Sequence, residues 1–182
     1  MEMNNDKKVY LFELDDVLYP KKDYVLQVYY LLSNFIEYTE GKPISKEVLQ
    51  DLKEYYLEQG EKGNIDHIIA KYKLSKKIKE NYERLFVNAQ LPLKLELFPS
   101  AVLYIGDLLS KNKGVGVLTK GNPVGQLNKI RQVNWKGLDA YLKVYFADEL
   151  RFRKLKPYLY IAEEFGVLPG EVEHITSKPI LK

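Results

Sequence analysis

Three carboxylates follow a short apolar run near the start of the chain. Residues 9–12 are all apolar, and Glu13, Asp15 and Asp16 come directly after them. A short apolar run of this kind predicts a buried strand of a parallel sheet. Because ligands of open α/β sheets bind outside the carboxyl ends of the strands, these carboxylates are expected to face a site. The alternative is that they are solvated loop charges.

Two later groups of polar residues follow apolar runs in the same way. Residues 119–122 (Thr-Lys-Gly-Asn) come after the run 114–118, and a basic stretch, 151–156, comes after the run 142–146. Phosphoryl transfer requires a carboxylate, hydroxyl and amide donors for the phosphate oxygens, and a cation against the developing charge. Singly, Thr119 could cap a helix, and the basic stretch could be a solvated surface. Together, at successive strand ends, the groups favour phosphoryl-transfer chemistry.

The elements that position these groups alternate between strand and helix. Such alternation indicates parallel βαβ units with right-handed crossovers. The predicted fold class is therefore α/β, with a Rossmann-like parallel sheet and helices on both faces. The predicted strands are 9–12, 114–118, 142–146 and 172–175, and the predicted helices of this part are 101–111, 124–133 and 157–165.

Residues 21–96 differ from the rest because they show helical periodicity and no strand pattern. Apolar residues recur at helical spacing in 23–38 and again in a stretch that starts at Ser45. Ser45 and Asn64 are predicted to be N-caps of helices. The predicted domains are a core of residues 1–20 and 97–182 and an inserted small α-helical cap of residues 21–96.

Length and composition limit the class of protein further. The 182 residues suffice for one sizeable core, and 46% hydrophobic with 29% charged residues is typical of a globular protein. The chain has no cysteine, so a cytoplasmic, reducing location is expected. No apolar run is long enough to span a membrane. The net charge of +3 is too small to predict nucleic-acid binding, so neither membrane nor nucleic acid is expected as a partner.

The motifs resemble those of the haloacid dehalogenase-like hydrolase superfamily. Residues 13–18 (Glu-Leu-Asp-Asp-Val-Leu) are similar to the family's first motif, D-x-D-x-[TV]-L, and residues 117–121 are similar to its second, a strand that ends in a phosphate-binding threonine. Lys154 matches the lysine of the third motif, with a proline and an aromatic residue at the family's spacing, and Lys156 is the second choice. The helical insert resembles the helical cap of the family's phosphatase branch.

This resemblance implies a magnesium-dependent phosphomonoesterase that acts on small phosphorylated molecules. In the family's mechanism the residue at Glu13 attacks phosphorus, and Asp15 protonates the leaving oxygen and then activates water. The residues implied to bind the phosphoryl group are Thr119, Lys120, Gly121 and Lys154. The groups implied to hold Mg²⁺ are the carboxylate of Glu13, the backbone carbonyl of Asp15 and the residue at position Ser177.

Two departures from the family pattern predict that hydrolase activity is weak or lost. Glu13 stands where the family has a nucleophilic aspartate, and the extra carbon moves the carboxylate by about 1.3 Å. Misplacement of a reacting group by ~1 Å can cost on the order of a hundredfold in rate. Ser177 stands where the family has a metal-binding aspartate, and a neutral hydroxyl is a poor ligand for a hard dication.

Two other functions are compatible with the same residues. A non-enzymatic phosphate-binding or regulatory module would keep Thr119 and Lys154, bind its ligand without magnesium and show no turnover. A receiver-like phosphoacceptor domain also has acids after its first strand, then a threonine and a lysine. The large helical insert after the first strand argues against the receiver.

Overall fold

Strand β1 (Val9–Phe12) lies inside a four-stranded parallel sheet in the computed structural model, which describes residues 6–177. The strand order is β5-β3-β1-β6, and every neighbouring pair is parallel. All four residues of β1 are buried, as the apolar run predicts. The α/β fold with a parallel sheet is confirmed. The other strands of this sheet are β3 (Gly114–Thr119), β5 (Lys143–Phe146) and β6 (Val172–Ile175).

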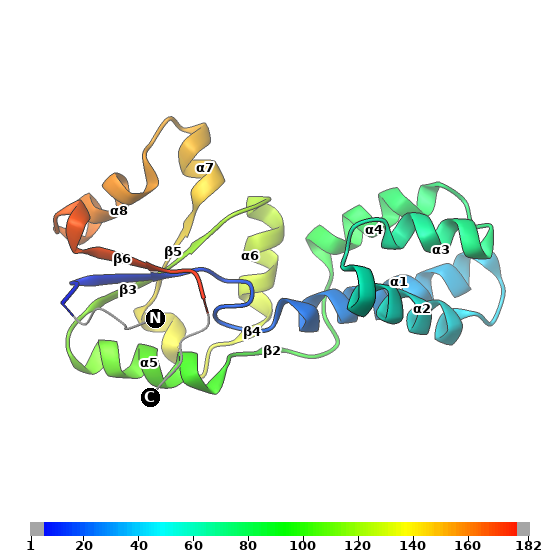
Figure 1. Ribbon diagram of the computed structural model, residues 1–182, viewed down its shortest axis with the longest axis horizontal. Helices are drawn as coiled ribbons and strands as arrows, with labels where there is room; N and C mark the ends of the chain where they lie inside the picture. The colour runs from blue at the N-terminus through cyan, green and yellow to red at the C-terminus, as the bar shows by residue number, and fades with distance from the viewer. Residues whose placement is uncertain (1–5, 178–182) are drawn as a thin grey trace. The chain divides into compact units, whose positions relative to one another are not determined.

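Successive side chains of β1 point to opposite faces of the sheet, and helices cover both faces (Figure 1). Leu11 packs in one cluster with Ile161 of helix α8. The rings of Tyr10 and Phe12 make edge-to-face contacts with Tyr104 of helix α5, at centroid distances of 6.2 and 5.9 Å. The apolar run of β1 is thus buried on both sides, as expected of a central parallel strand. The helices of this part are α5 (Pro99–Ser110), α6 (Pro123–Gln132), α7 (Ala147–Phe152) and α8 (Pro157–Phe165).

Helix α6 begins directly after β3, and its start is set by local sequence. The side-chain oxygen of Asn122 accepts hydrogen bonds from the backbone N–H groups of Val124 and Gly125, at 2.9 and 3.2 Å. Pro123 occupies the first turn, where its missing N–H costs nothing. Asn122 is therefore the N-cap of α6, and the helix-capping alternative for Thr119 is wrong.

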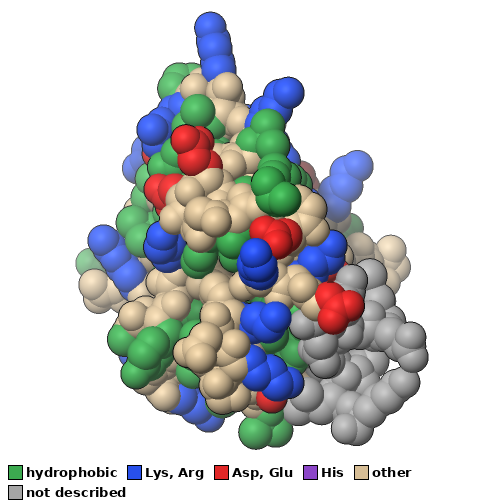
Figure 2. Space-filling model, turned by 90° about the vertical axis from the view of Figure 1, so that its left-hand side faces the viewer, with side chains coloured by type: hydrophobic (Ala, Val, Ile, Leu, Met, Phe, Trp, Pro, Cys, Tyr) green, Lys and Arg blue, Asp and Glu red, His purple; other side chains and the backbone are tan. Residues whose placement is uncertain are grey.

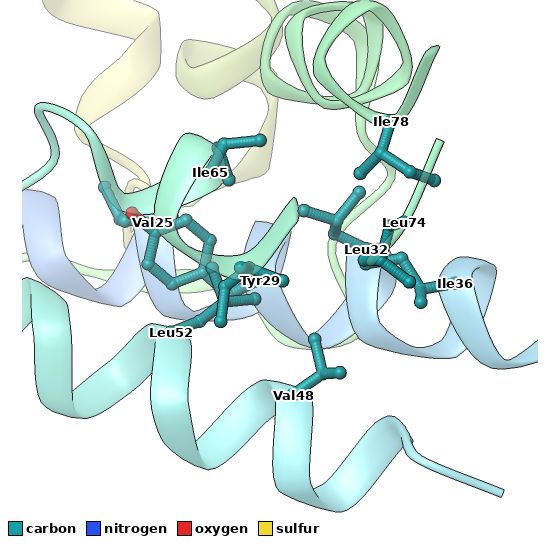
Figure 3. Packing of buried hydrophobic residues seen from close by; sticks show 10 residues of the cluster. Val25, Tyr29, Leu32, Ile36, Val48, Leu52, Ile65, Leu74 and Ile78 are labelled. Carbon is teal, nitrogen blue, oxygen red and sulfur yellow. The ribbon is translucent and has the colours of Figure 1, made fainter. Parts of the chain in front are cut away.

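Residues 22–93 form a compact helical unit, and the remaining described residues, 6–21 and 94–177, form the sheet unit. One apolar stripe of α1 supplies the centre of the core of the helical unit, with residues at helical spacing (Figure 3). The buried residues of this core are Val25, Tyr29, Leu32, Ile36, Val48, Leu52, Ile65, Ile68, Leu74 and Ile78. The helices are α1 (Lys21–Glu40), α2 (Ser45–Gln59), α3 (Asn64–Tyr72) and α4 (Lys77–Asn88).

Ser45 and Asn64 are not the helix caps that the sequence predicts. No side-chain cap hydrogen bond forms at the start of α2, and the backbone N–H of Ser45 donates to the Glu37 carboxylate at 2.9 Å. The N-cap of α3 is Gly63, and Asn64 is fully buried. The Asn64 amide donates to the hydroxyl of Tyr29 at 3.0 Å and to the carbonyl of Leu52 at 2.8 Å. Contacts with distant parts of the chain therefore take up the polar groups of Ser45 and Asn64, which local sequence rules predict to cap helices.

Several short elements were not predicted. Strands β2 (Leu95–Glu96) and β4 (Val133–Asn134) form a separate parallel pair. Helix α7 includes the first two residues of the basic stretch 151–156. Elements of two to six residues are too short for a periodic pattern to identify them. The two 3₁₀ turns of the described chain are η1 (Leu138–Tyr141) and η2 (Pro169–Glu171).

Charged side chains are dispersed over the face shown in Figure 2, with lysine and arginine at separate places among acidic and apolar groups. Exposed ion pairs of the sheet unit include Lys136 with Glu96 at 3.3 Å. Such exposed pairs contribute little to stability. The absence of a nucleic-acid partner stays a prediction. Over residues 6–177, none of the helices combines the length and the apolar character needed to cross a membrane.

Two glycines of the sheet unit are expected to respond in opposite ways to alanine substitution. At Gly116 of β3, a Cβ would lie 2.9 Å from the backbone oxygen of Lys143 and 3.2 Å from a methyl of Leu11. We therefore expect Gly116→Ala to destabilise the protein by about 1–3 kcal/mol. Gly106 lies on the exposed side of α5 with open space around it, so Gly106→Ala should stabilise by about 1 kcal/mol. Urea unfolding measures both, and equal midpoints for the two variants would contradict the expectation.

Candidate active site at the strand ends

The carboxyl ends of β1, β3, β5 and β6 meet at one edge of the sheet. Phe12, the last residue of β1, is paired in register with Val117 of β3 and with Ile175, the last residue of β6. The backbone N–H of Glu13 donates to the carbonyl of Ile175 at 2.9 Å. Thr119, the last residue of β3, is paired with the last residue of β5. The polar groups that follow these strands therefore lie at the same edge, as the sequence predicts.

Glu13 is a largely buried carboxylate among polar groups from other strand ends. Its Oε1 accepts a hydrogen bond from the backbone N–H of Lys120 at 3.2 Å, and its Oε2 lies 3.9 Å from the Lys120 ammonium. The same oxygen lies 3.6 Å from Nε2 of His174. Burial raises the pKa of Glu13, and the charge and backbone N–H of Lys120 oppose that rise. The longer side chain of glutamate thus brings the carboxylate against the loop after β3.

Both carboxylate oxygens of Asp15 have close donors within the protein. Oδ2 lies 2.6 Å from the ammonium of Lys129, and Oδ1 accepts a hydrogen bond from the hydroxyl of Tyr19 at 2.6 Å. The Lys129 side chain is only 5% exposed, whereas that of Asp15 is 22% exposed. The lysine is therefore held inside the sheet unit with its charge directed at Asp15.

Lys129 and Gln126 belong to the site, and sequence reasoning missed both. They lie on the buried face of α6 together with Gly125. The signal that could have found them is their spacing: residues 125, 126 and 129 share one helical face, directly after the loop that follows Thr119. A buried helical face made of glycine, glutamine and lysine indicates that the helix packs against polar groups.

Thr119 is buried, and its position is set by α6. Its hydroxyl oxygen accepts a hydrogen bond from the Gln126 amide at 2.6 Å, and the same amide nitrogen donates to the carbonyl of Lys120 at 2.8 Å. One glutamine side chain therefore holds the last residue of β3 and the first residue of the loop that follows. Because the Thr119 hydroxyl accepts from Gln126, its own hydrogen can be donated to another acceptor.

Asp148 is a second carboxylate at the loop after β3, and the sequence analysis did not select it. Its Oδ2 accepts a hydrogen bond from the backbone N–H of Gly121 at 2.7 Å, and its Oδ1 lies 2.6 Å from the guanidinium of Arg151. The Gly121 N–H, together with Arg151, lowers the pKa of Asp148. Asp148 follows the end of β5 by two residues, so the rule that selected Glu13 and Asp15 could also have found it.

The remaining residues that the sequence predicts for the site are exposed or serve another purpose. Lys154 is exposed in the turn after α7, and within residues 6–177 no hydrogen bond or ion pair joins it to Glu13, Asp15 or Thr119. Ser177 is exposed, two residues beyond the end of β6. Their roles stay predictions. Asp16 has a φ of 60°, and its carboxylate accepts a hydrogen bond from the Lys21 N–H at the start of α1.

The donor set of the described residues is a poor fit to Mg²⁺. Magnesium requires several oxygen ligands in octahedral geometry. The carboxylate of Glu13 faces the Lys120 ammonium, and that of Asp15 is paired with Lys129. No group of three or more His, Cys, Asp or Glu in this part of the chain could hold a metal ion. The two carboxylates are thus already matched with cations of the protein.

Comparison with known proteins gives structural but no sequence matches. No protein-family model and no curated protein sequence matches the chain. A solved dehalogenase structure matches at 16% identity with a TM-score of 0.51, over 97% of this chain and 79% of that one. A Thermotoga maritima protein assigned as a β-phosphoglucomutase matches at 18% identity with a TM-score of 0.56, over 92% and 74%. An L-2-haloacid dehalogenase matches at 14% identity with a TM-score of 0.50, over 94% and 78%.

These likenesses concern the fold, because every identity is low. They span nearly the whole chain, so the sheet and the helical insert are both part of the similarity. The order of elements, with a helical stretch directly after the first strand, agrees with the family that the motifs resemble. The chain therefore has the fold of the haloacid dehalogenase-like hydrolases.

Proposed function

We propose that the protein has the site of a haloacid dehalogenase-like phosphomonoesterase whose hydrolytic activity is weak or lost. The pairing of Asp15 with buried Lys129 carries this proposal. A general acid and base must exchange a proton with the substrate through a carboxylate oxygen. In Asp15 one oxygen is 2.6 Å from Lys129 and the other is 2.6 Å from the Tyr19 hydroxyl. Substrate would have to displace one of these donors.

The position of Glu13 supports the same proposal. A nucleophilic carboxylate needs an oxygen directed at phosphorus and aligned with the leaving group. Oε1 of Glu13 instead accepts a hydrogen bond from the Lys120 N–H. The same carboxylate faces the Lys120 ammonium, so the site is also a poor fit to Mg²⁺.

The proposed ligand is a small phosphorylated molecule. Support comes from the hydroxyl of Thr119, the backbone N–H groups of Lys120 and Gly121, and the Lys120 ammonium, which all lie at the end of β3. Such donors recognise phosphate oxygens. A second candidate, a phosphate-binding module without turnover, is favoured by the exposure of the Lys120 side chain, which is 56% exposed beside the carboxyl ends of the strands.

A phosphatase panel tests this proposal. We expect the purified protein with magnesium to hydrolyse small phosphomonoesters no faster than its Asp15→Asn variant, because Asp15 already has two protein donors. Release of inorganic phosphate is the measurement, and circular dichroism verifies that the variant is folded. Strong wild-type turnover that Asp15→Asn abolishes would contradict the proposal. Binding of a non-hydrolysable phosphonate in the presence of a chelator, without turnover, would favour the second candidate.

A further inference from the structure

We propose that the loop at Lys120 and Gly121 is a binding site for small dianions, and that Glu13 and Asp148 of the same chain occupy it. This inference rests on the proposed function for the location of the site, and it adds a mechanism that controls access. The ligand class is a compact dianion of the phosphate or sulfate type. In the absence of ligand, the two carboxylates accept the hydrogen bonds that the dianion would otherwise accept.

The first argument is the convergence of backbone donors on negative groups. The N–H groups of two consecutive residues, Lys120 and Gly121, both donate to carboxylates, at 3.2 and 2.7 Å. Gly121 has a φ of +101°, a conformation that favours glycine. Consecutive N–H groups in such a turn form a concave anion-binding feature of the backbone. The carboxylates come from the segment directly after β1 and from α7, so two separate parts of the chain bring negative charge to the same loop.

The second argument is that each of these carboxylates also has a cation close to it. The Lys120 ammonium lies 3.9 Å from Glu13, and the Arg151 guanidinium lies 2.6 Å from Asp148. A dianion that replaced the carboxylates would gain two backbone N–H donors and these two cations. Charge-assisted hydrogen bonds of this kind are stronger than neutral ones. Each protein carboxylate supplies one charge and must be displaced, so the two lower the apparent affinity for an external ion.

A third, independent observation is an unsatisfied buried atom. Nε2 of His174 is buried and has no hydrogen-bond partner within residues 6–177, while Nδ1 is 2.7 Å from the hydroxyl of Tyr158. Oε2 of Glu13 lies 3.6 Å from Nε2, which is too far for a hydrogen bond. Buried polar atoms are normally paired, so this ring nitrogen beside Glu13 is a further polar group that a bound anion could contact.

Sulfate is the appropriate probe because it is fully a dianion at the pH of the experiment, whereas phosphate is a mixture of charge states. Isothermal titration of sulfate into the wild type, Glu13→Gln and Asp148→Asn is carried out with a chelator at about pH 8. Glu149→Gln is the matched control, since it removes the same charge from the residue next to Asp148. We expect Glu13→Gln and Asp148→Asn to bind sulfate on the order of tenfold more tightly than the wild type and the control.

Equal sulfate affinity in Glu13→Gln, Asp148→Asn and Glu149→Gln would overturn the proposal. If Glu13→Gln does not fold, the sulfate affinity of Asp148→Asn compared with that of Glu149→Gln decides. No substrate or turnover enters this experiment, so its outcome is distinct from that of the phosphatase panel.

Discussion

Replacing Lys129 with methionine is expected to lower the free energy of unfolding by about 3 kcal/mol. The change removes the cation that lies 2.6 Å from Asp15 and leaves the carboxylate without it. Breaking a buried ion pair costs about 3–5 kcal/mol because the remaining charge is uncompensated. The lower end of that range applies because Asp15 is 22% exposed and keeps the hydrogen bond from Tyr19. Methionine fills similar volume, so little of the loss comes from packing.

Urea unfolding of the variant measures this loss, and Lys111→Met is the matched control. Lys111 lies 2.7 Å from Asp107, a similar distance, but both side chains are about half exposed. An exposed pair at this helical spacing is worth about 0.3–0.5 kcal/mol. Adding Asp15→Asn to Lys129→Met should recover part of the stability, because no charge is then left unpaired. Equal losses for Lys129→Met and Lys111→Met would contradict the burial argument.

The double variant Glu13→Asp with Ser177→Asp is expected to gain magnesium-dependent phosphatase activity, on the order of a hundredfold over the wild type. Aspartate at position 13 withdraws the carboxylate by about 1.3 Å from its contact with the Lys120 N–H. Aspartate at position 177, two residues beyond β6, adds a carboxylate at the same edge of the sheet. Each single change should gain little, since groups that act as a unit are not additive.

Phosphate release from the same panel of phosphomonoesters, with and without magnesium, measures this gain. The control Glu13→Asp with Ser177→Asn has nearly the same shape but lacks the second charge. Adding Asp15→Asn to the active double variant should remove the new turnover. Equal activity in the aspartate and asparagine versions at position 177 would contradict the role given to that residue. A double variant that folds but gains no phosphatase activity would contradict the prediction. It would mean that the pairing of Asp15 with Lys129 is enough by itself to prevent turnover.

The sequence by itself determined the fold class and the edge of the sheet where the candidate site lies. Local patterns carry this information: an apolar run such as residues 9–12 is buried in a parallel sheet, and the polar residues that follow parallel strands must lie at one edge. The same reasoning located Glu13, Asp15 and Thr119 together. It could also place the helical stretch, because periodicity extends over many residues there.

Only the tertiary structure decided which groups face one another at that edge. Asp15 is paired with Lys129, 114 residues away, and Asp148 is bonded to Gly121, 27 residues away. Such partners depend on how α6 and α7 pack against the sheet, and no local pattern in a single sequence records this. Asn64 shows the same limit, since its buried hydrogen bonds to Tyr29 and Leu52 replace the helix cap that its type predicts. Residue type sets what a side chain can bond, but its partner is set by packing between distant segments.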